Sequence, residues 1–191
     1  MGEDCRGRPR QWLDERLLLI ERFARLNSMA IVDTETGEQQ DLLASAERSI
    51  TNARVSPYGR WVAFDASPPG EPSSVFVGAV QRRPIREADW VIVERFASHP
   101  FWSANGTILY YTPTGAIPMV RSSVRGRRFV PETGALDEPF TVYSSSEMLM
   151  PAYLPGTAPV ATPDRIILVL GDFRGDVWLM DLAASGPAPD R

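Results

Sequence analysis

The chain has 191 residues, of which 43% are hydrophobic and 23% charged, a composition ordinary for a folded protein and too apolar for a disordered one. The formal charge of −4 argues against a nucleic-acid surface, and the single Cys and single His exclude an internal disulfide and a His-rich metal site. All 20 basic residues are Arg, which excludes mechanisms that need a Lys nucleophile, a Schiff base or a phosphate-binding Lys.

The two ends of the chain differ from the rest in composition. Residues 1–10 are polar and lack the apolar core of a signal peptide, and no run approaches the roughly 18 apolar residues of a membrane span. We therefore expect a cytoplasmic chain with no membrane span, or a periplasmic one if it is part of a longer exported protein. Residues 1–10 are expected to precede the fold, and residues 183–191 are expected to form a disordered tail.

A repeat organises the sequence between these ends. Ser56-Pro57-Tyr58-Gly59 precedes an apolar run at 61–64, and Ser103-Ala104-Asn105-Gly106 precedes another at 108–111, so that the two glycines are 47 residues apart. Each glycine stands where a tight turn needs a positive φ, and each run is apolar on both faces, which is typical of a strand buried on both sides. Weaker copies lie at 12–20 and 162–169.

Further short strands are expected at regular intervals, at 28–33, 40–43, 74–78, 90–94, 117–122, 140–143 and 176–181. The chain then divides into four units of up to four strands, at about 11–44, 50–97, 98–145 and 150–182. Units of this length, made of hairpin-connected strands, are typical of β-propeller blades.

Two other folds compete with this interpretation. Residues 13–26 are compatible with a helix as well as a strand, and the register of the repeat favours the strand. A doubly wound α/β fold would also bury such strands on both faces. It would need amphipathic helices between them, where this sequence carries Pro, Gly and Ser instead.

The two clear repeats resemble the TolB-type β-propeller repeat, a WD-repeat-like motif in which Ser-Pro-Asp-Gly precedes an apolar strand. Tyr58 and Asn105 stand at the position where that motif usually has Asp. The resemblance implies an all-β propeller, here of about four blades of four-stranded antiparallel sheet in an incomplete ring. The residues that carry this structural motif are Ser56, Pro57, Gly59, Trp61, Phe64, Trp102, Ser103, Gly106, Tyr110 and Trp178.

The last unit lacks an outer strand, and residues 1–10 contain no strand that would complete it. Apolar faces would then be left bare on the end blades. We expect the chain to be the C-terminal part of a longer bacterial propeller protein, or to self-associate through those faces.

Catalytic signals are weak. A Gly-x-Ser-x-Gly elbow is missing, and His99, the one candidate general base for a triad, is expected to be structural or solvent-facing. Cys5 lies in the polar N-terminus, and we expect its thiol to be exposed and to have no catalytic role. The carboxylate pairs lie at predicted turns and none has the spacing of a Ca²⁺ loop. We therefore predict no catalytic residue, no metal and no cofactor.

The leading functional hypothesis is a non-catalytic scaffold module that binds a protein or peptide partner, within a sensor, regulator or TolB-like envelope protein. A second hypothesis is the propeller cap of a serine peptidase of the prolyl-oligopeptidase type, without its catalytic domain. A third, an enzyme with its site in the central channel, would require a pocket lined by two carboxylates with an Arg or His99.

Overall fold

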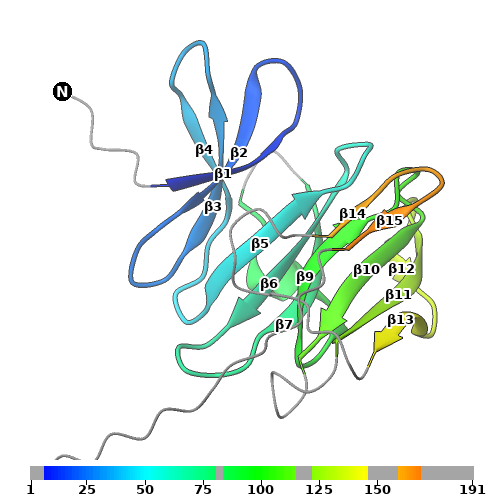
Figure 1. Ribbon diagram of the computed structural model, residues 1–191. Helices are drawn as coiled ribbons and strands as arrows, with labels where there is room; N and C mark the ends of the chain where they lie inside the picture. The colour runs from blue at the N-terminus through cyan, green and yellow to red at the C-terminus, as the bar shows by residue number, and fades with distance from the viewer. Residues whose placement is uncertain (1–6, 81–83, 115–121, 146–158, 169–191) are drawn as a thin grey trace, which may run out of the picture.

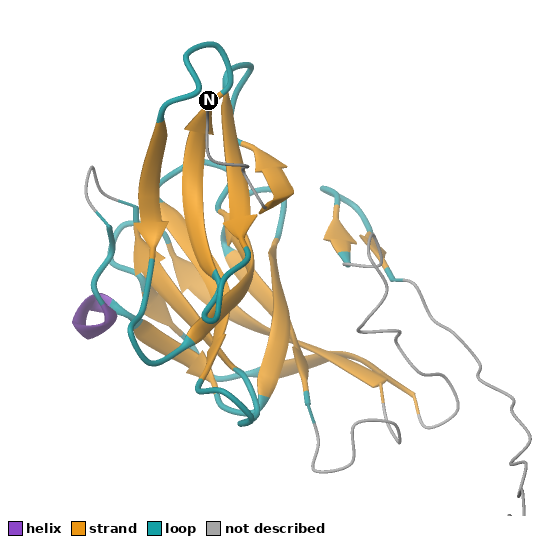
Figure 2. Ribbon diagram, turned by 90° about the vertical axis from the view of Figure 1, so that its left-hand side faces the viewer, coloured by secondary structure: helices purple, strands orange, loops and turns teal. Residues whose placement is uncertain are grey.

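The computed structural model describes residues 7–80, 84–114, 122–145 and 159–168, and the fold of these residues is all-β. Three antiparallel sheets follow one another along the chain, which we call blades 1, 2 and 3, and a short hairpin follows them (Figure 1). Figure 2 shows that strands dominate the described part of the chain, with a single turn of 3-10 helix, η1 (Glu87–Asp89).

Each sheet is built from strands in chain order. Blade 1 consists of β1 (Gly7–Trp12), β2 (Leu17–Arg22), β3 (Ser28–Asp33) and β4 (Gln39–Leu43). Blade 2 consists of β5 (Ser49–Val55), β6 (Trp61–Ser67), β7 (Ser74–Ala79) and β8 (Val91–Glu94). Blade 3 consists of β9 (Ala97–Trp102), β10 (Ile108–Pro113), β11 (Ser122–Val130) and β13 (Phe140–Ser145), with β12 (Ala135–Leu136) also paired to β11. The final hairpin is β14 (Val160–Ala161) and β15 (Ile166–Ile167).

The blades are arranged about a common axis. The last strand of one blade leads to the first strand of the next, and the first strands contact one another in the order β1, β5, β9 and β14. First strands that meet while the rest of each sheet diverges are the defining feature of a propeller. The predicted all-β propeller with an incomplete ring is therefore confirmed for the described residues.

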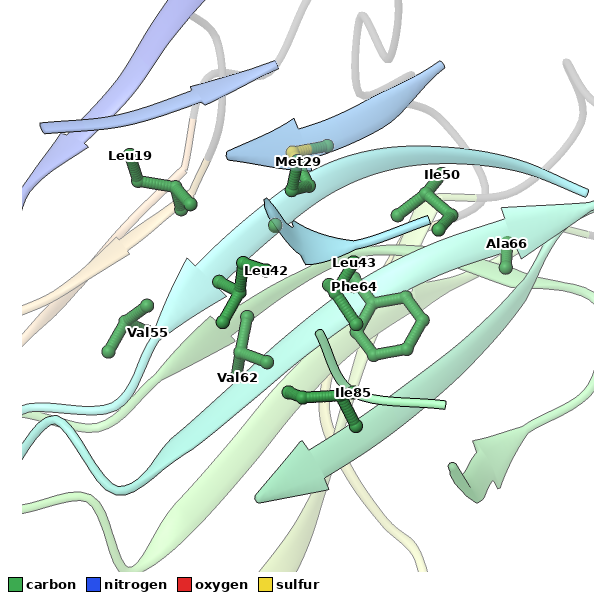
Figure 3. Close-up of a cluster of buried hydrophobic side chains, with 11 residues drawn as sticks. Leu19, Met29, Leu42, Leu43, Ile50, Val55, Val62, Phe64, Ala66 and Ile85 are labelled. Carbon is green, nitrogen blue, oxygen red and sulfur yellow. The ribbon is translucent and has the colours of Figure 1, made fainter. Parts of the chain in front are cut away.

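Apolar side chains fill the space between successive blades. Figure 3 shows the cluster between blades 1 and 2, where Leu19 and Met29 of blade 1 lie over Val62 and Phe64 of β6. Ala63, on the opposite face of β6, belongs to a second cluster that joins blades 2 and 3. Both faces of this central strand are thus buried, as its unbroken apolar sequence predicts.

The two Ser-x-x-Gly turns share one hydrogen-bond pattern. The Ser56 N–H donates to the Trp61 carbonyl at 2.8 Å, and the Ser103 N–H donates to the Ile108 carbonyl at 2.9 Å. In return the Trp61 N–H donates to Ser56 Oγ at 3.2 Å and the Ile108 N–H to Ser103 Oγ at 2.9 Å. The serine therefore closes the turn with both its backbone and its side chain, which explains why both copies carry it.

The glycines of these turns adopt the left-handed conformation, with φ of 71° at Gly59 and 64° at Gly106. A Cβ at Gly106 would lie 3.3 Å from Pro57 Cδ, so the turns of blades 2 and 3 also touch.

One sequence prediction is corrected. The fold begins at Gly7, because residues 7–10, expected to precede it, form most of β1. That strand has β2 as its one neighbour in the sheet and lies at the sheet edge, the position at which strands tolerate a proline such as Pro9. The third strand of blade 3 is β11, in which Val124 and Phe129 provide the buried side chains despite the arginines between them. Of the strand expected at 117–122, residues 117–121 lie outside the described residues, and Ser122 is the first residue of β11. Trp178, the strand at 176–181 and the tail at 183–191 lie outside the described residues.

The packing of blade 2 on blade 3 can be tested at Gly134, in the turn between β11 and β12. This glycine has a φ of +76°, and a Cβ there would lie 2.4 Å from Cη2 of Trp61. We expect Gly134→Ala to lower the free energy of unfolding by about 3 kcal/mol, combining left-handed strain of about 1–2 kcal/mol with overpacking of about 1–3 kcal/mol.

Gly37→Ala is the matched control for this substitution. Gly37 has a φ of +75° and nothing within 4 Å of the added carbon, so that only the backbone strain applies. Urea denaturation of both variants measures the difference, and equal losses of stability would show that the Trp61 contact is unimportant.

Candidate functional site

A β-bulge recurs in the first strand of each blade. The pairing register shifts between Pro9 and Gln11 in β1, between Thr51 and Arg54 in β5, and along β9 opposite Tyr110 and Thr112 of β10. Each bulge interrupts the pairing of the strand that lies nearest the axis. Bulges redirect side chains and are conspicuous near functional sites.

The bulges of blades 2 and 3 share an unusual backbone. Asn52 has a φ of 53° and His99 a φ of 55°, and the two residues are 47 residues apart, the same spacing as the turn glycines. Non-glycine residues in this region are uncommon, and Asn and His are among those that tolerate it best. The two repeats are therefore alike in the backbone conformation of their bulges as well as in their turns.

A chain of polar groups connects the three bulges. The guanidinium of Arg10 donates to Glu21 Oε2 from Nε at 2.5 Å and to Asn52 Oδ1 at 3.0 Å. Asn52 Nδ2 donates to Asp65 Oδ2 at 2.7 Å, and the backbone N–H of His99 donates to the same oxygen at 3.3 Å. Residues of blades 1, 2 and 3 are thus joined at the axis by hydrogen bonds.

Asp65 is the most buried acid in this chain of contacts, with 1% of its surface exposed. Burial raises the pKa of Asp65 to about 7, although its hydrogen bonds from Asn52 and His99 and the charge of Arg10 act in the opposite direction. The second oxygen, Oδ1, has no hydrogen-bond partner among the described residues. The carboxyl group is therefore neutral in part of the molecules near neutral pH.

Ser98, His99 and Asp65 lie together but are not arranged as a catalytic triad. A triad needs the acid on one ring nitrogen of the His and the nucleophile on the other. Here the Ser98 hydroxyl lies 2.9 Å from Nδ1 of its own neighbour His99, and Asp65 accepts the backbone N–H of His99 instead of a ring N–H.

A pocket of about 220 Å³ opens next to this polar chain, at the end of the axis where the first strands finish. It is bounded by all four sheets: Gln11 of blade 1, residues of β5 and the turn after it, residues of β9 and the turn after it, and β14. The lining residues are Gln11, Arg54, Val55, Pro57, Phe101, Trp102, Ser103, Ala104, Pro159, Val160 and Ala161. We call this the axial pocket.

Hydrogen bonds between blades hold the walls of the axial pocket. The side-chain amide of Gln11 donates to the Val55 carbonyl at 3.1 Å and accepts the Val55 N–H at 2.9 Å, as a neighbouring strand would. On the other side, the indole N–H of Trp102 donates to the Arg54 carbonyl at 2.9 Å. The backbone of Arg54 and Val55 is therefore held by hydrogen bonds from Gln11 of blade 1 and Trp102 of blade 3.

Arg54 carries the one charged side chain that lines the described axial pocket. It is half-buried, and its NH1 donates to the Ala53 carbonyl at 3.0 Å. Burial lowers the pKa of Arg54, and the nearby charge of Arg10 lowers it further.

The sequence motif and the pocket overlap only in part. Pro57, Trp102 and Ser103 line the pocket. The other predicted motif residues that the structure describes lie in turns or between strands and blades: Ser56, Gly59, Trp61, Phe64, Gly106 and Tyr110. The sequence analysis missed Arg54, Asn52 and Asp65. The 47-residue spacing of Asn52 and His99 is the signal that could have found the bulges.

Two other features are missing from the described residues. These residues contain no group of three His, Cys, Asp or Glu side chains placed to hold a metal ion. They also contain no helix with the length and apolar character needed to cross a membrane. Cys5 lies outside the described part of the chain.

Comparison with known proteins supports the fold. No protein-family model and no curated protein matches the sequence. Among solved structures, the chain is similar to a prolyl endopeptidase, with a TM-score of 0.55 and 20% identity over 83% of this chain and 23% of that one. It is also similar to a puromycin-hydrolysing peptidase from Mycobacterium tuberculosis, with a TM-score of 0.50 and 16% identity over 76% and 26% of the two chains.

A putative TolB from Agrobacterium tumefaciens gives a TM-score of 0.49 at 16% identity over 68% of this chain and 46% of that one, which is too low to support an argument. The chain spans about a quarter of the length of the two peptidases. At these identities the similarity concerns the fold alone, which is that of a β-propeller.

The raised pKa of Asp65 predicts how stability depends on pH. The folded state keeps a proton that the unfolded state releases above about pH 4, so the free energy of unfolding falls as pH rises toward 7, by up to about 4 kcal/mol from this residue. Asp65→Asn keeps an oxygen for Asn52 and His99 to bond. We expect this variant to be more stable than the wild type by about 1 kcal/mol or more at pH 8, with a smaller advantage at pH 5.

Asp33→Asn is the control in the same urea titrations at pH 5 to 8. The Arg16 guanidinium beside Asp33 holds the pKa of that carboxyl well below its usual range, so Asp33 stays ionised throughout this window. Its replacement should lower stability by the same amount at each pH. A stability difference between Asp65→Asn and wild type that does not change with pH would contradict the assignment to Asp65.

Proposed function

We propose that this propeller is a non-catalytic module that binds a peptide or a protein segment in the axial pocket. The observation that carries the proposal is the pocket itself. It is bounded by all four sheets at the axis, and most of its wall is apolar, with Arg54 as its charged group. A concave site with apolar walls and a small number of polar groups is the usual form of a binding site.

The geometry of the polar residues supports a binding role over a catalytic one. Ser98, His99 and Asp65 are oriented differently from a triad, and the described pocket is lined by Arg54 without the two carboxylates that a central-channel enzyme would need. Glu21 instead pairs with Arg10 within blade 1, and Asp65 accepts hydrogen bonds from Asn52 of blade 2 and from the backbone of His99 in blade 3.

The shared turns support the finer assignment to TolB-type repeats. Both copies use the serine in the same two hydrogen bonds and place glycine at a positive φ. On this proposal the chain is part of a larger bacterial sensor, regulator or envelope protein, and the peptide belongs to a partner of that protein.

A second candidate function is the propeller cap of a serine peptidase. Its support is that the fold resembles about a quarter of two chains that are named as peptidases. The coding sequence on both sides of these 191 residues distinguishes the two functions. A hydrolase domain in the same reading frame favours the cap, and a kinase, a DNA-binding domain or a signal peptide favours the binding module.

Self-association is a further proposed interaction. Trp12 and Phe23 of blade 1 are 60% and 46% exposed, and neither contributes to the described apolar clusters. Light scattering of the chain at increasing concentration tests this proposal, because a constant monomer mass would contradict it.

Binding in the axial pocket can be tested with a displayed library of random 12-residue peptides, selected on the full chain. Selected peptides are then measured by isothermal titration calorimetry against Val160→Trp, which fills the pocket with an indole ring. We expect Val160→Trp to weaken peptide binding by about tenfold or more, a loss of at least 1.4 kcal/mol.

Ile167→Trp is the matched control, because Ile167 pairs with Val160 across the hairpin, is exposed to the same extent (55% and 54%) and does not line the pocket. It should leave the affinity within about twofold. Failure to select any peptide, or equal losses in both variants, would contradict binding in the axial pocket.

A further inference from the structure

We propose that the axial pocket recognises a carboxylate of the bound peptide, and that Arg54 is the residue that holds it. This inference rests on the proposed function and specifies its ligand. Two sources supply such a group, a free C-terminus or an Asp or Glu side chain, and both present the same planar anion.

Two neighbouring arginines at the axis differ in whether the fold supplies them with an anion. Arg10 and Arg54 lie on the first strands of blades 1 and 2, close enough for the charge of one to affect the pKa of the other. Arg10 forms an ion pair with Glu21, and both side chains are nearly inaccessible, with 11% and 3% of their surface exposed. Arg54 forms no ion pair with any described residue. The fold thus neutralises one axial guanidinium and leaves the other without an anion.

The donors of Arg54 are incompletely used. A guanidinium has five N–H donors, and among the described residues NH1 of Arg54 makes one hydrogen bond, to the Ala53 carbonyl. Arg54 is a lining residue of the pocket, and on this proposal an anion in the pocket bonds to the remaining donors of its guanidinium. Two parallel N–H···O bonds to one carboxylate are the geometry that a guanidinium favours.

The electrostatic surroundings of Arg54 favour an anion. Burial of this cation removes water from it, which is unfavourable unless an opposite charge is supplied. Arg10 adds positive potential, while Asp65 and Glu21 act in the opposite direction. Glu21 is already paired with Arg10, and Asp65 is partly neutral near pH 7, so neither cancels the charge of Arg54.

The size and walls of the pocket suit one residue of a peptide. Its volume of about 220 Å³ is smaller than the roughly 300–1,000 Å³ typical of sites for drug-sized ligands. Val55, Pro57, Phe101 and Val160 supply an apolar wall beside the guanidinium. A phosphate dianion usually needs more than one cation or several backbone donors, whereas one guanidinium balances a carboxylate.

The test uses small probes and nuclear magnetic resonance of the full chain labelled with ¹⁵N. The probes are N-acetyl-leucine, which has a free α-carboxylate, N-acetyl-glutamate α-amide, which has a side-chain carboxylate, and N-acetyl-leucinamide, which has neither. We expect at least one of the two carboxylates to shift the Trp102 indole N–H and the Arg54 Nε–H signals in a saturable way, and the amide to shift neither. The stronger of the two responses identifies the source of the carboxylate.

Three variants separate the charge of Arg54 from the folding of the pocket. Arg54→Gln should weaken carboxylate binding, followed at Trp102, by about tenfold or more, as expected for a lost charged hydrogen bond. Arg54→Lys should recover part of the affinity because it keeps the charge. Arg25→Gln removes the same charge from the exposed turn between β2 and β3, at the opposite end of the blade, and should leave binding unchanged. Thermal unfolding of each variant shows that the fold is retained.

The outcomes distinguish this inference from the proposed function. Selected peptides that bind in the pocket with equal affinity to wild type and Arg54→Gln would overturn the carboxylate assignment and leave peptide binding intact. Saturable carboxylate binding without any selected peptide would support Arg54 and overturn the proposed function. Responses to both carboxylate probes that are no larger than the response to N-acetyl-leucinamide, or a stronger response to inorganic phosphate, would also overturn the assignment.

Discussion

The structure depends on one constraint, the burial of both faces of the central strands β6 and β10. In β6, Val62 and Phe64 face blade 1 while Ala63 faces blade 3, so that the strand is stable only between two other sheets. Each sheet has the same right-handed twist, so sheets that stack face to face are rotated relative to one another. The blades therefore spread outward from a common axis. The close contact of Gly134 with Trp61 is a consequence, since the turn of one blade must pack against the ring of the next.

The same constraint determines what occurs at the axis. The first strand of each blade is the edge of its sheet, and its unpaired backbone groups face the first strands of the neighbouring blades. Polar contacts satisfy these groups: Gln11 pairs with the Val55 backbone, and Asp65 accepts the N–H that the bulge at His99 turns toward it. Apolar contacts thus join the blades along their faces, and hydrogen bonds join them at the axis.

The sequence predicts the parts of this fold that depend on local pattern. Two kinds of feature could be placed: the apolar runs at 61–64 and 108–111, and the turns at Ser56 and Ser103. Burial on both faces requires an unbroken apolar run, and a positive φ in a turn favours glycine, so each feature is visible within one short segment of the sequence. Strands β1 and β11 could not, since Pro9 and the arginines of β11 are acceptable only in view of their neighbours in the sheet. The polar contacts at the bulges and the walls of the pocket depend on residues from different strands and blades, such as Arg10 with Asn52, which no single segment of the sequence reveals.

The charge of the axial pocket can be changed without changing the apolar side chains that pack the blades. Val55 and Trp102 belong both to the apolar clusters between blades and to the lining of the pocket, whereas Arg54 belongs to the lining alone. Arg54 joins its neighbours through backbone atoms, with Trp102 bonded to its carbonyl, so a change of its side chain alters the charge of the pocket while that bond remains. Arg10 has the opposite role, since its guanidinium is itself a contact between blades. The similarity to parts of two peptidase chains therefore concerns the fold alone, and the side chains of the axial pocket determine what it can bind.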